Sequence, residues 1–197
     1  MEPLDERAQR IVETAVALAE RDGFAAVRLR DVAASANVAL GTVYKRFSSK
    51  EEILIAALEQ ESERMVERLG KTATPGETPA IRARHLFRQV TRGMCRKPNL
   101  TKALVRSIAS GDPNITDRVA SFHAMMTALI IGAIRGSAAS SAKTWDAAVE
   151  KKEREVASIL QQVWFSALVG WAGGIHDQDM IIAYVDAAIE HLLSDEK

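Results

Sequence analysis

Residues 24–54 read FAAVRLRDVAASANVALGTVYKRFSSKEEIL. Apolar side chains recur at helical spacing in two short segments, roughly 28–35 and 40–46, which Ala36-Asn37-Val38 separates. Six side chains have the spacing to fill a small core between the segments: Val32, Ala33, Ala36, Val38, Val43 and Phe47. The stretch therefore predicts a helix-turn-helix, in which the second helix enters the major groove of DNA while the first crosses the backbone.

The distribution of charge supports this interpretation. The chain holds 26 Lys and Arg residues and 26 Asp and Glu residues, so its formal net charge is zero. Between Arg21 and Lys50, however, six Lys or Arg residues stand against two Asp residues. Binding to phosphates needs local cations, so this excess favours a contact with DNA. A basic run can also be an ordinary solvated surface, and this alternative stays open for Arg21 and Arg46.

Helical periodicity continues through nearly the whole chain, and strand-length alternation is absent. A first helix ends at Asp22-Gly23, and Ser49 with Glu52 forms the capping-box pattern that starts a fourth helix, 49–69. Further breaks are expected at 71–79, Pro98, 110–113, 136–141 and 173–174. We predict an all-α fold of about nine helices, with a three-helix domain at 1–48 and a second helical domain at 49–197, connected by helix 49–69.

Composition and motifs exclude several classes of protein. The single cysteine, Cys95, allows no intramolecular disulfide and no cysteine-based metal cluster. The four histidines lack metal-site spacing, and the motifs of hydrolases, nucleotide-binding enzymes and zinc proteases are absent. We therefore predict that the protein is not an enzyme and needs no metal or cofactor. No run of about 18 apolar residues and no secretory signal is found, so we expect a cytoplasmic protein that does not enter the membrane.

The helix-turn-helix stretch resembles the TetR family of bacterial repressors. The matching residues are Gly23-Phe24, Asp31-Val32-Ala33, Ala36–Val38, Gly41-Thr42-Val43-Tyr44, Phe47 and Ser49-Lys50-Glu51-Glu52. The resemblance implies a transcriptional repressor in which Thr42 and Tyr44 contact phosphates or bases and Lys50 meets a phosphate. We predict a DNA-binding set of eight residues: Arg28, Arg30, Ala39, Gly41, Thr42, Tyr44, Lys45 and Lys50.

Two positions depart from the family pattern. Arg28 stands where a threonine or serine is frequent, so the usual hydroxyl cap is missing and Arg28 is expected to reach a phosphate instead. Asn37 stands where glycine is frequent, and asparagine tolerates the left-handed backbone that a tight turn can require.

The resemblance also implies that the second domain binds an effector. The predicted pocket comprises Met94, Phe122, His123, Met126, Trp164, Leu168 and Trp171. These side chains could equally fill an ordinary core, and His123 is either a hydrogen-bond partner of a ligand carbonyl or a satisfied interior histidine. Met94–Ala103, Val163–Ser166 and Trp171 are similar to the branch that represses sterol catabolism. We expect release from DNA by a small apolar effector, either a steroid or a fatty-acid thioester of coenzyme A.

The final helix, at 177–194, carries apolar residues on more than one face, so we expect it to be buried on both sides. In the TetR family the last two helices of each subunit form a four-helix bundle, and the resulting dimer reads a palindromic operator. The predicted interface residues are Val163, Ile182, Val185 and Ile189.

Three alternatives to a ligand-released repressor stay open on the sequence. Arg96 and Lys97 could lower the pKa of Cys95 and make it a redox sensor. An activator of the same fold would have the same sequence pattern. The third alternative is a purely architectural DNA-binding protein, and the size of the second domain argues against it, because bending DNA would not need so large a domain.

Overall fold

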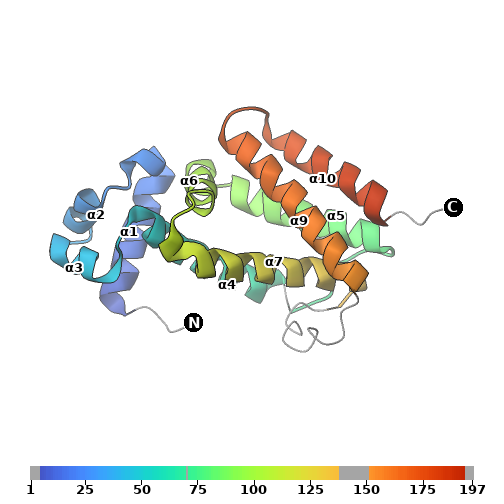
Figure 1. Cartoon of the computed structure of the whole chain (residues 1–197), viewed down its shortest axis with the longest axis horizontal. Helices are drawn as coiled ribbons and strands as arrows, with labels where there is room; N and C mark the ends of the chain where they lie inside the picture. Colours follow the sequence, from blue (N-terminus) through green and yellow to red (C-terminus); the bar gives the residue numbers. More distant parts are fainter. Residues whose placement is uncertain (1–4, 70, 138–150, 194–197) are drawn as a thin grey trace. The chain divides into compact units, whose positions relative to one another are not determined.

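The computed structural model describes residues 5–69, 71–137 and 151–193. Within these residues the chain forms nine α-helices and two 3-10 turns and no strand (Figure 1). The predicted all-α fold class is confirmed. Most of the predicted break at 136–141 lies outside the described residues.

The first helix, α1 (Glu6–Asp22), has a capping residue before its first turn and a glycine after its last turn. The Asp5 carboxylate accepts a hydrogen bond from the Ala8 amide at 2.9 Å, and so caps an amide that has no partner within the helix. One face, which includes Ile11 and Ala15, is fully buried. The helix ends at Gly23, whose φ of 79° lies in the left-handed region that glycine adopts without strain.

The helix-turn-helix consists of α2 (Leu29–Ser35) and α3 (Leu40–Arg46), preceded by the 3-10 turn η1 (Phe24–Ala26). Asn37 has a φ of 53°, so the turn between the two helices uses the left-handed conformation that we expected of this residue. Val32, Val43 and Phe47 are buried between the helices. The core predicted for this motif is therefore largely present.

The helix α4 (Lys50–Leu69) starts with a variant of the predicted capping box. Ser49 Oγ accepts a hydrogen bond from the Glu52 amide at 3.1 Å, as the pattern requires. The Glu52 carboxylate, however, accepts from the Ser48 amide at 2.6 Å and from the Ser48 hydroxyl at 2.9 Å. The reciprocal bond thus reaches one residue further back than we predicted.

Five helices follow: α5 (Pro79–Cys95), α6 (Pro98–Ile108), α7 (Thr116–Arg135), α9 (Lys151–Ala172) and α10 (Gln178–Leu193). The second 3-10 turn, η2 (Pro113–Ile115), precedes α7. Pro98 does more than end α5, because it occupies the first turn of α6, where its missing N–H has no acceptor to lose. The helix that we expected near 101–109 therefore starts three residues earlier.

Within the described residues the chain divides into two compact units, Met1–Glu61 with Lys97–Val119 and Ser62–Arg96 with Ala120–Lys197. This division differs from the predicted boundary after residue 48, because α6 packs on α1 and η1. The Asn99 amide donates to the carbonyl of Glu20 at 3.2 Å, and Lys97 pairs with the Glu20 carboxylate at 3.0 Å. These contacts bind α6 to the end of α1.

In the second unit, α10 packs on both α9 and α5, and Figure 1 shows α9 and α10 side by side in orange and red. Trp164 of α9 is fully buried, and its ring centroid lies 6.0 Å from that of Phe87 on α5. The indole N–H of Trp164 donates to the hydroxyl of Thr91 at 3.0 Å, which satisfies a polar group inside this core.

The loop predicted at 71–79 is fixed at its far end by Arg82. Its guanidinium donates to the carbonyls of Ala133 and Ile134, at 2.8 and 2.6 Å, and so caps the last turn of α7. It also donates to the carbonyls of Gly76 and Glu77 in the loop. One cationic side chain therefore joins the loop to α7.

One segment, Pro113–Arg135, is long and apolar enough to cross a membrane when judged by length and composition alone. Core helices meet the same criterion. Met126 and Ile130 of this segment are fully buried within the second unit, which is the behaviour of a core helix.

Candidate functional site

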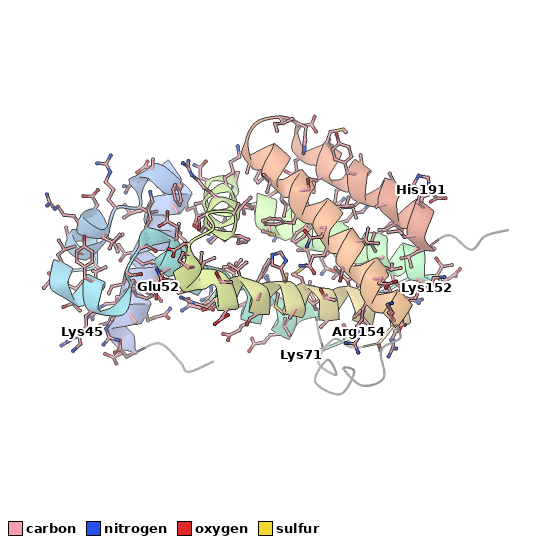
Figure 2. All side chains as sticks on the ribbon, in the orientation of Figure 1. Lys45, Glu52, Lys71, Lys152, Arg154 and His191 are labelled. Carbon is pink, nitrogen blue, oxygen red and sulfur yellow. The ribbon has the colours of Figure 1, made fainter. Side chains whose placement is uncertain are left out.

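The exposed face of α3 carries the predicted base-reading residues. Val43 and Phe47 turn inward and are buried, and this leaves Ala39, Gly41, Tyr44 and Lys45 exposed and Thr42 half-buried. Tyr44 is 58% exposed, so it is not a core aromatic, whereas Phe47 is. Lys45 lies on the outside of the unit (Figure 2). This face can donate hydrogen bonds to phosphates and to base edges.

Two further predicted cations lie at the start of α2. Arg28 is the N-cap residue, and its side chain makes no capping hydrogen bond. Both Arg28 and Arg30 are exposed. Arg46, in contrast, forms an ion pair with Asp5, so part of the local positive charge counted from the sequence is neutralised within the unit.

Lys50 lies at the start of α4, with its ammonium group 3.8 Å from the centroid of the Phe24 ring. The guanidinium carbon of Arg106, on α6, lies 4.6 Å from the same centroid. Each contact is a cation–π interaction. The sequence analysis missed Arg106, because it assigned α6 to the other domain.

The first half of α4 is held by contacts with η2 and with the start of α7. Ser49 Oγ donates to the Asp112 carboxylate at 3.2 Å. Arg118 Nε donates to Glu59 Oε1 at 2.7 Å, and the hydrogen bond and charge of Glu59 hold the pKa of the guanidinium above its usual value. These bonds fix the helix that carries Lys50 inside the first unit.

The predicted pocket residues all lie in the second unit, on α5, α7 and α9. Phe122, Met126, Trp164, Leu168 and Trp171 are buried, and Met94 and His123 are half-buried. The His123 ring makes edge contacts with Phe122 and Phe165, at centroid distances of 5.7 and 5.6 Å. The structure thus brings part of the predicted set into one aromatic cluster.

Two polar residues that the sequence analysis missed lie beside this cluster. Thr127 Oγ1 lies 3.0 Å from the carbonyl oxygen of His123 and 2.7 Å from Oε1 of Gln161. Nε2 of Gln161 and Nδ1 of His123 share a hydrogen bond. Burial lowers the pKa of the His123 imidazole below its usual value. His123 is therefore uncharged at neutral pH and hydrogen-bonded on one side.

The predicted dimer interface needs a correction. Val185 and Ile189 are fully buried inside their own subunit, where α10 packs on α5 and α9, so their side chains are not available to a partner. Val163 and Ile182 are half-buried. The large exposed hydrophobic side chains of the last two helices are Ile159, Val169 and Tyr184, at 47%, 39% and 47% exposure.

The structure bears on the redox alternative at Cys95. Burial raises the pKa of its thiol to about 11, which is opposite to the lowering that Arg96 and Lys97 could have caused. A protonated thiol reacts slowly with oxidants, which argues against the redox alternative. Among the described residues, no group of three His, Cys, Asp or Glu side chains could hold a metal ion.

Residues 11–57 match the family of "Bacterial regulatory proteins, tetR family", and residues 76–192 match the "Tetracyclin repressor-like, C-terminal domain". The chain is 33% identical to the HTH-type transcriptional repressor KstR of Rhodococcus jostii (strain RHA1), over 96% of this chain and 84% of that protein. It is 29% identical to KstR of Mycobacterium tuberculosis (strain ATCC 25618 / H37Rv), over 97% of this chain and 82% of that protein.

The fold is similar to two solved structures. A TetR transcriptional regulator from Rhodococcus sp. RHA1 has a TM-score of 0.78 at 23% identity, over 98% of both chains. FadR of Thermus thermophilus, a TetR-family repressor solved in complex with lauroyl-CoA, has a TM-score of 0.64 at 20% identity, over 96% of this chain and 97% of that one.

Proposed function

Because the chain belongs to the TetR family of bacterial regulatory proteins and is a transcriptional repressor, we propose that it binds a palindromic operator as a homodimer and is released by a small apolar effector. The observation that carries the DNA part is the exposed face of α3, on which Tyr44 and Lys45 stand clear of the core. Arg28, Arg30 and Lys50 add cations on the flanking elements, and they serve as phosphate contacts that fix the register of α3 in the groove.

The effector is proposed to be a thioester of coenzyme A with a steroid or fatty acid. Two observations support this class: the resemblance of Met94–Ala103 to the sterol-catabolism branch, and the lauroyl-CoA complex of the Thermus neighbour. The predicted pocket residues supply a mainly apolar lining of the kind that binds a ring system or an acyl chain.

The dimer is proposed to form through the outward faces of α9 and α10. Ile159, Val163, Ser166 and Val169 follow one another along α9 at helical spacing, and Gly173 comes directly after the end of this helix. None of these residues is fully buried in the subunit. Tyr184 adds an exposed aromatic side chain on α10. Apolar side chains alternating with small residues allow two such helix pairs to approach closely.

The experiment is a footprint on the DNA that flanks the gene of this protein. We expect two protected half-sites about 34–36 Å apart, which is one turn of the double helix. Lauroyl-CoA or a steroid-acid thioester should abolish the protection, whereas free coenzyme A should not. Protection that no thioester relieves would contradict the effector part, and a single protected half-site would contradict the dimer.

A further inference from the structure

Gly41 is the second residue of α3 and is exposed. Its backbone is helical, so it does not need the left-handed conformation that explains Gly23. A Cβ atom at position 41 would meet no atom beyond its own stretch of helix within 4 Å. Neither backbone geometry nor packing within the subunit therefore requires a glycine here, although an alanine would favour the helix. The physical reason that remains is the close approach of a molecule from outside.

The side chains beside Gly41 come from the next turn of α3. Tyr44 and Lys45 follow it by three and four residues, which makes both of them its neighbours on the helix surface. Both are exposed, and side chains of a helix lean toward its N-terminus, so they border position 41. The missing Cβ leaves a gap about the size of a methyl group. Because the Tyr44 ring forms part of its border, the gap suits an apolar group.

The hydrogen-bonding side chains of α3 leave one kind of base pair without a specific partner. This helix, which the structure describes in full, contains no asparagine or glutamine, the side chains that form two hydrogen bonds with adenine. Its arginine, Arg46, is ion-paired with Asp5. Lys45 can recognise guanine, and the hydroxyl of Thr42 bonds to several bases. An adenine–thymine pair must therefore be distinguished by α3 through apolar contact.

We propose that Gly41 is a thymine-reading position: in each half-site the 5-methyl group of one thymine enters the gap at Gly41 and contacts the Tyr44 ring. Thymine is the base that presents a methyl group in the major groove, whereas the other three present donors and acceptors to this edge. A polar edge placed against Cα and an aromatic ring would lose its hydrogen bonds to water. The inference rests on the proposed binding of α3 in the major groove and adds the identity of one base to it.

The first test removes the methyl group and nothing else. In an operator defined by the footprint, each thymine of the half-site is replaced in turn by deoxyuridine, symmetrically in both half-sites, and affinity is measured by fluorescence anisotropy. Burial of one methyl group changes affinity about fourfold, so the loss of two should weaken binding about 15-fold at one position of the half-site. Thymines elsewhere in the half-site should show little effect.

The second test fills the gap from the side of the protein. Gly41→Ala places a methyl group where the thymine methyl is proposed to lie, so binding to the thymine operator should fall by about tenfold or more. Deoxyuridine at the position found in the first test should restore part of this loss. The preference for thymine in the wild type should therefore become a preference for deoxyuridine in Gly41→Ala.

Gly93 of α5 supplies a matched control. It is also an exposed helical glycine, and a Cβ there would likewise meet nothing within 4 Å. Gly93→Ala should keep the affinity and the thymine preference of the wild type. Both alanine variants should unfold about 1–4 °C above the wild type, because alanine favours the helix. A lower midpoint in Gly41→Ala alone would mean that the subunit itself requires the glycine, and would overturn the inference.

The outcomes separate the two proposals. Absence of any protected DNA site overturns the proposed operator binding, and thymine reading with it. Protection without any thymine whose methyl group matters overturns thymine reading and leaves operator binding intact. An equal loss on deoxyuridine substitution in the wild type and in Gly41→Ala has the same meaning, because the methyl group would then lie away from position 41.

Discussion

Replacing Lys50 with methionine removes a charge at the start of α4 and keeps most of the volume of the side chain. If Lys50 binds one phosphate per subunit, a dimer loses two phosphate contacts. Each contact contributes about 0.9 to the slope of log affinity against log salt concentration, so the slope should fall by about 1.8. Affinity should fall most at low salt, where the release of counterions contributes most to binding.

The structure adds a control for this experiment. Lys50 and Arg106 both contact the Phe24 ring, at 3.8 and 4.6 Å. Each replacement by methionine removes one cation–π contact, which is worth about 0.5–1 kcal/mol at a partly exposed site. The two variants should therefore lose similar stability to urea, but only Lys50→Met should change the salt slope.

The assay is fluorescence anisotropy of an operator duplex across a series of salt concentrations, with urea unfolding of each variant in parallel. An unchanged slope in Lys50→Met would remove Lys50 from the DNA interface and assign it to the support of Phe24. An equal change of the salt slope in Lys50→Met and Arg106→Met would contradict a specific role of Lys50, because both cations around Phe24 would then contribute to phosphate binding.

Three further predictions follow from buried and exposed positions. Val169→Asp should dissociate the proposed dimer, as measured by sedimentation velocity. Ile189→Ala should instead lower the free energy of unfolding by about 2–5 kcal/mol and leave the association of the folded protein unchanged. A monomeric wild type would contradict the proposed interface. Thr91→Val should lower the free energy of unfolding by about 1–3 kcal/mol, because it leaves the buried indole N–H of Trp164 without its acceptor. The same substitution should cost less in a Trp164→Phe background, where the N–H is already gone; an equal loss in both backgrounds would argue against this hydrogen bond. Since the pKa of Cys95 is about 11, the thiol should react with iodoacetamide at pH 7 about 100-fold more slowly than a thiol of ordinary pKa, and a rate equal to that of glutathione would contradict this.

The helices could be predicted from the sequence, because the start and end of each depend on residues that are close together in the chain. The end of α1 at Gly23 and the left-handed Asn37 follow from side-chain chemistry at single positions. The inward turn of Phe47 and the outward turn of Tyr44 follow from helical spacing alone. These features were predictable because no distant part of the chain is needed to specify them.

The errors concern which helix packs on which. Helical periodicity shows that α6 has a buried face but not that α1 covers it, so the domain boundary was placed after residue 48. The helix α10 is apolar on more than one face, and the pattern could not show that Val185 and Ile189 turn toward their own subunit. For Gln161 a signal did exist, since it lies four residues after the buried Ala157 and seven before the buried Leu168.

The packing of α6 on α1 has a consequence for synthesis and for the design of fragments. The first unit is discontinuous in sequence, because Lys97–Val119 completes what Met1–Glu61 begins. As the chain leaves the ribosome, α1 must wait for the 75 residues of 23–97 before its partner helix emerges. A fragment that ends after the recognition helix exposes the surface of α1 that α6 covers. A DNA-binding module cut from this protein would therefore need α6 joined directly behind α4, with α5 removed.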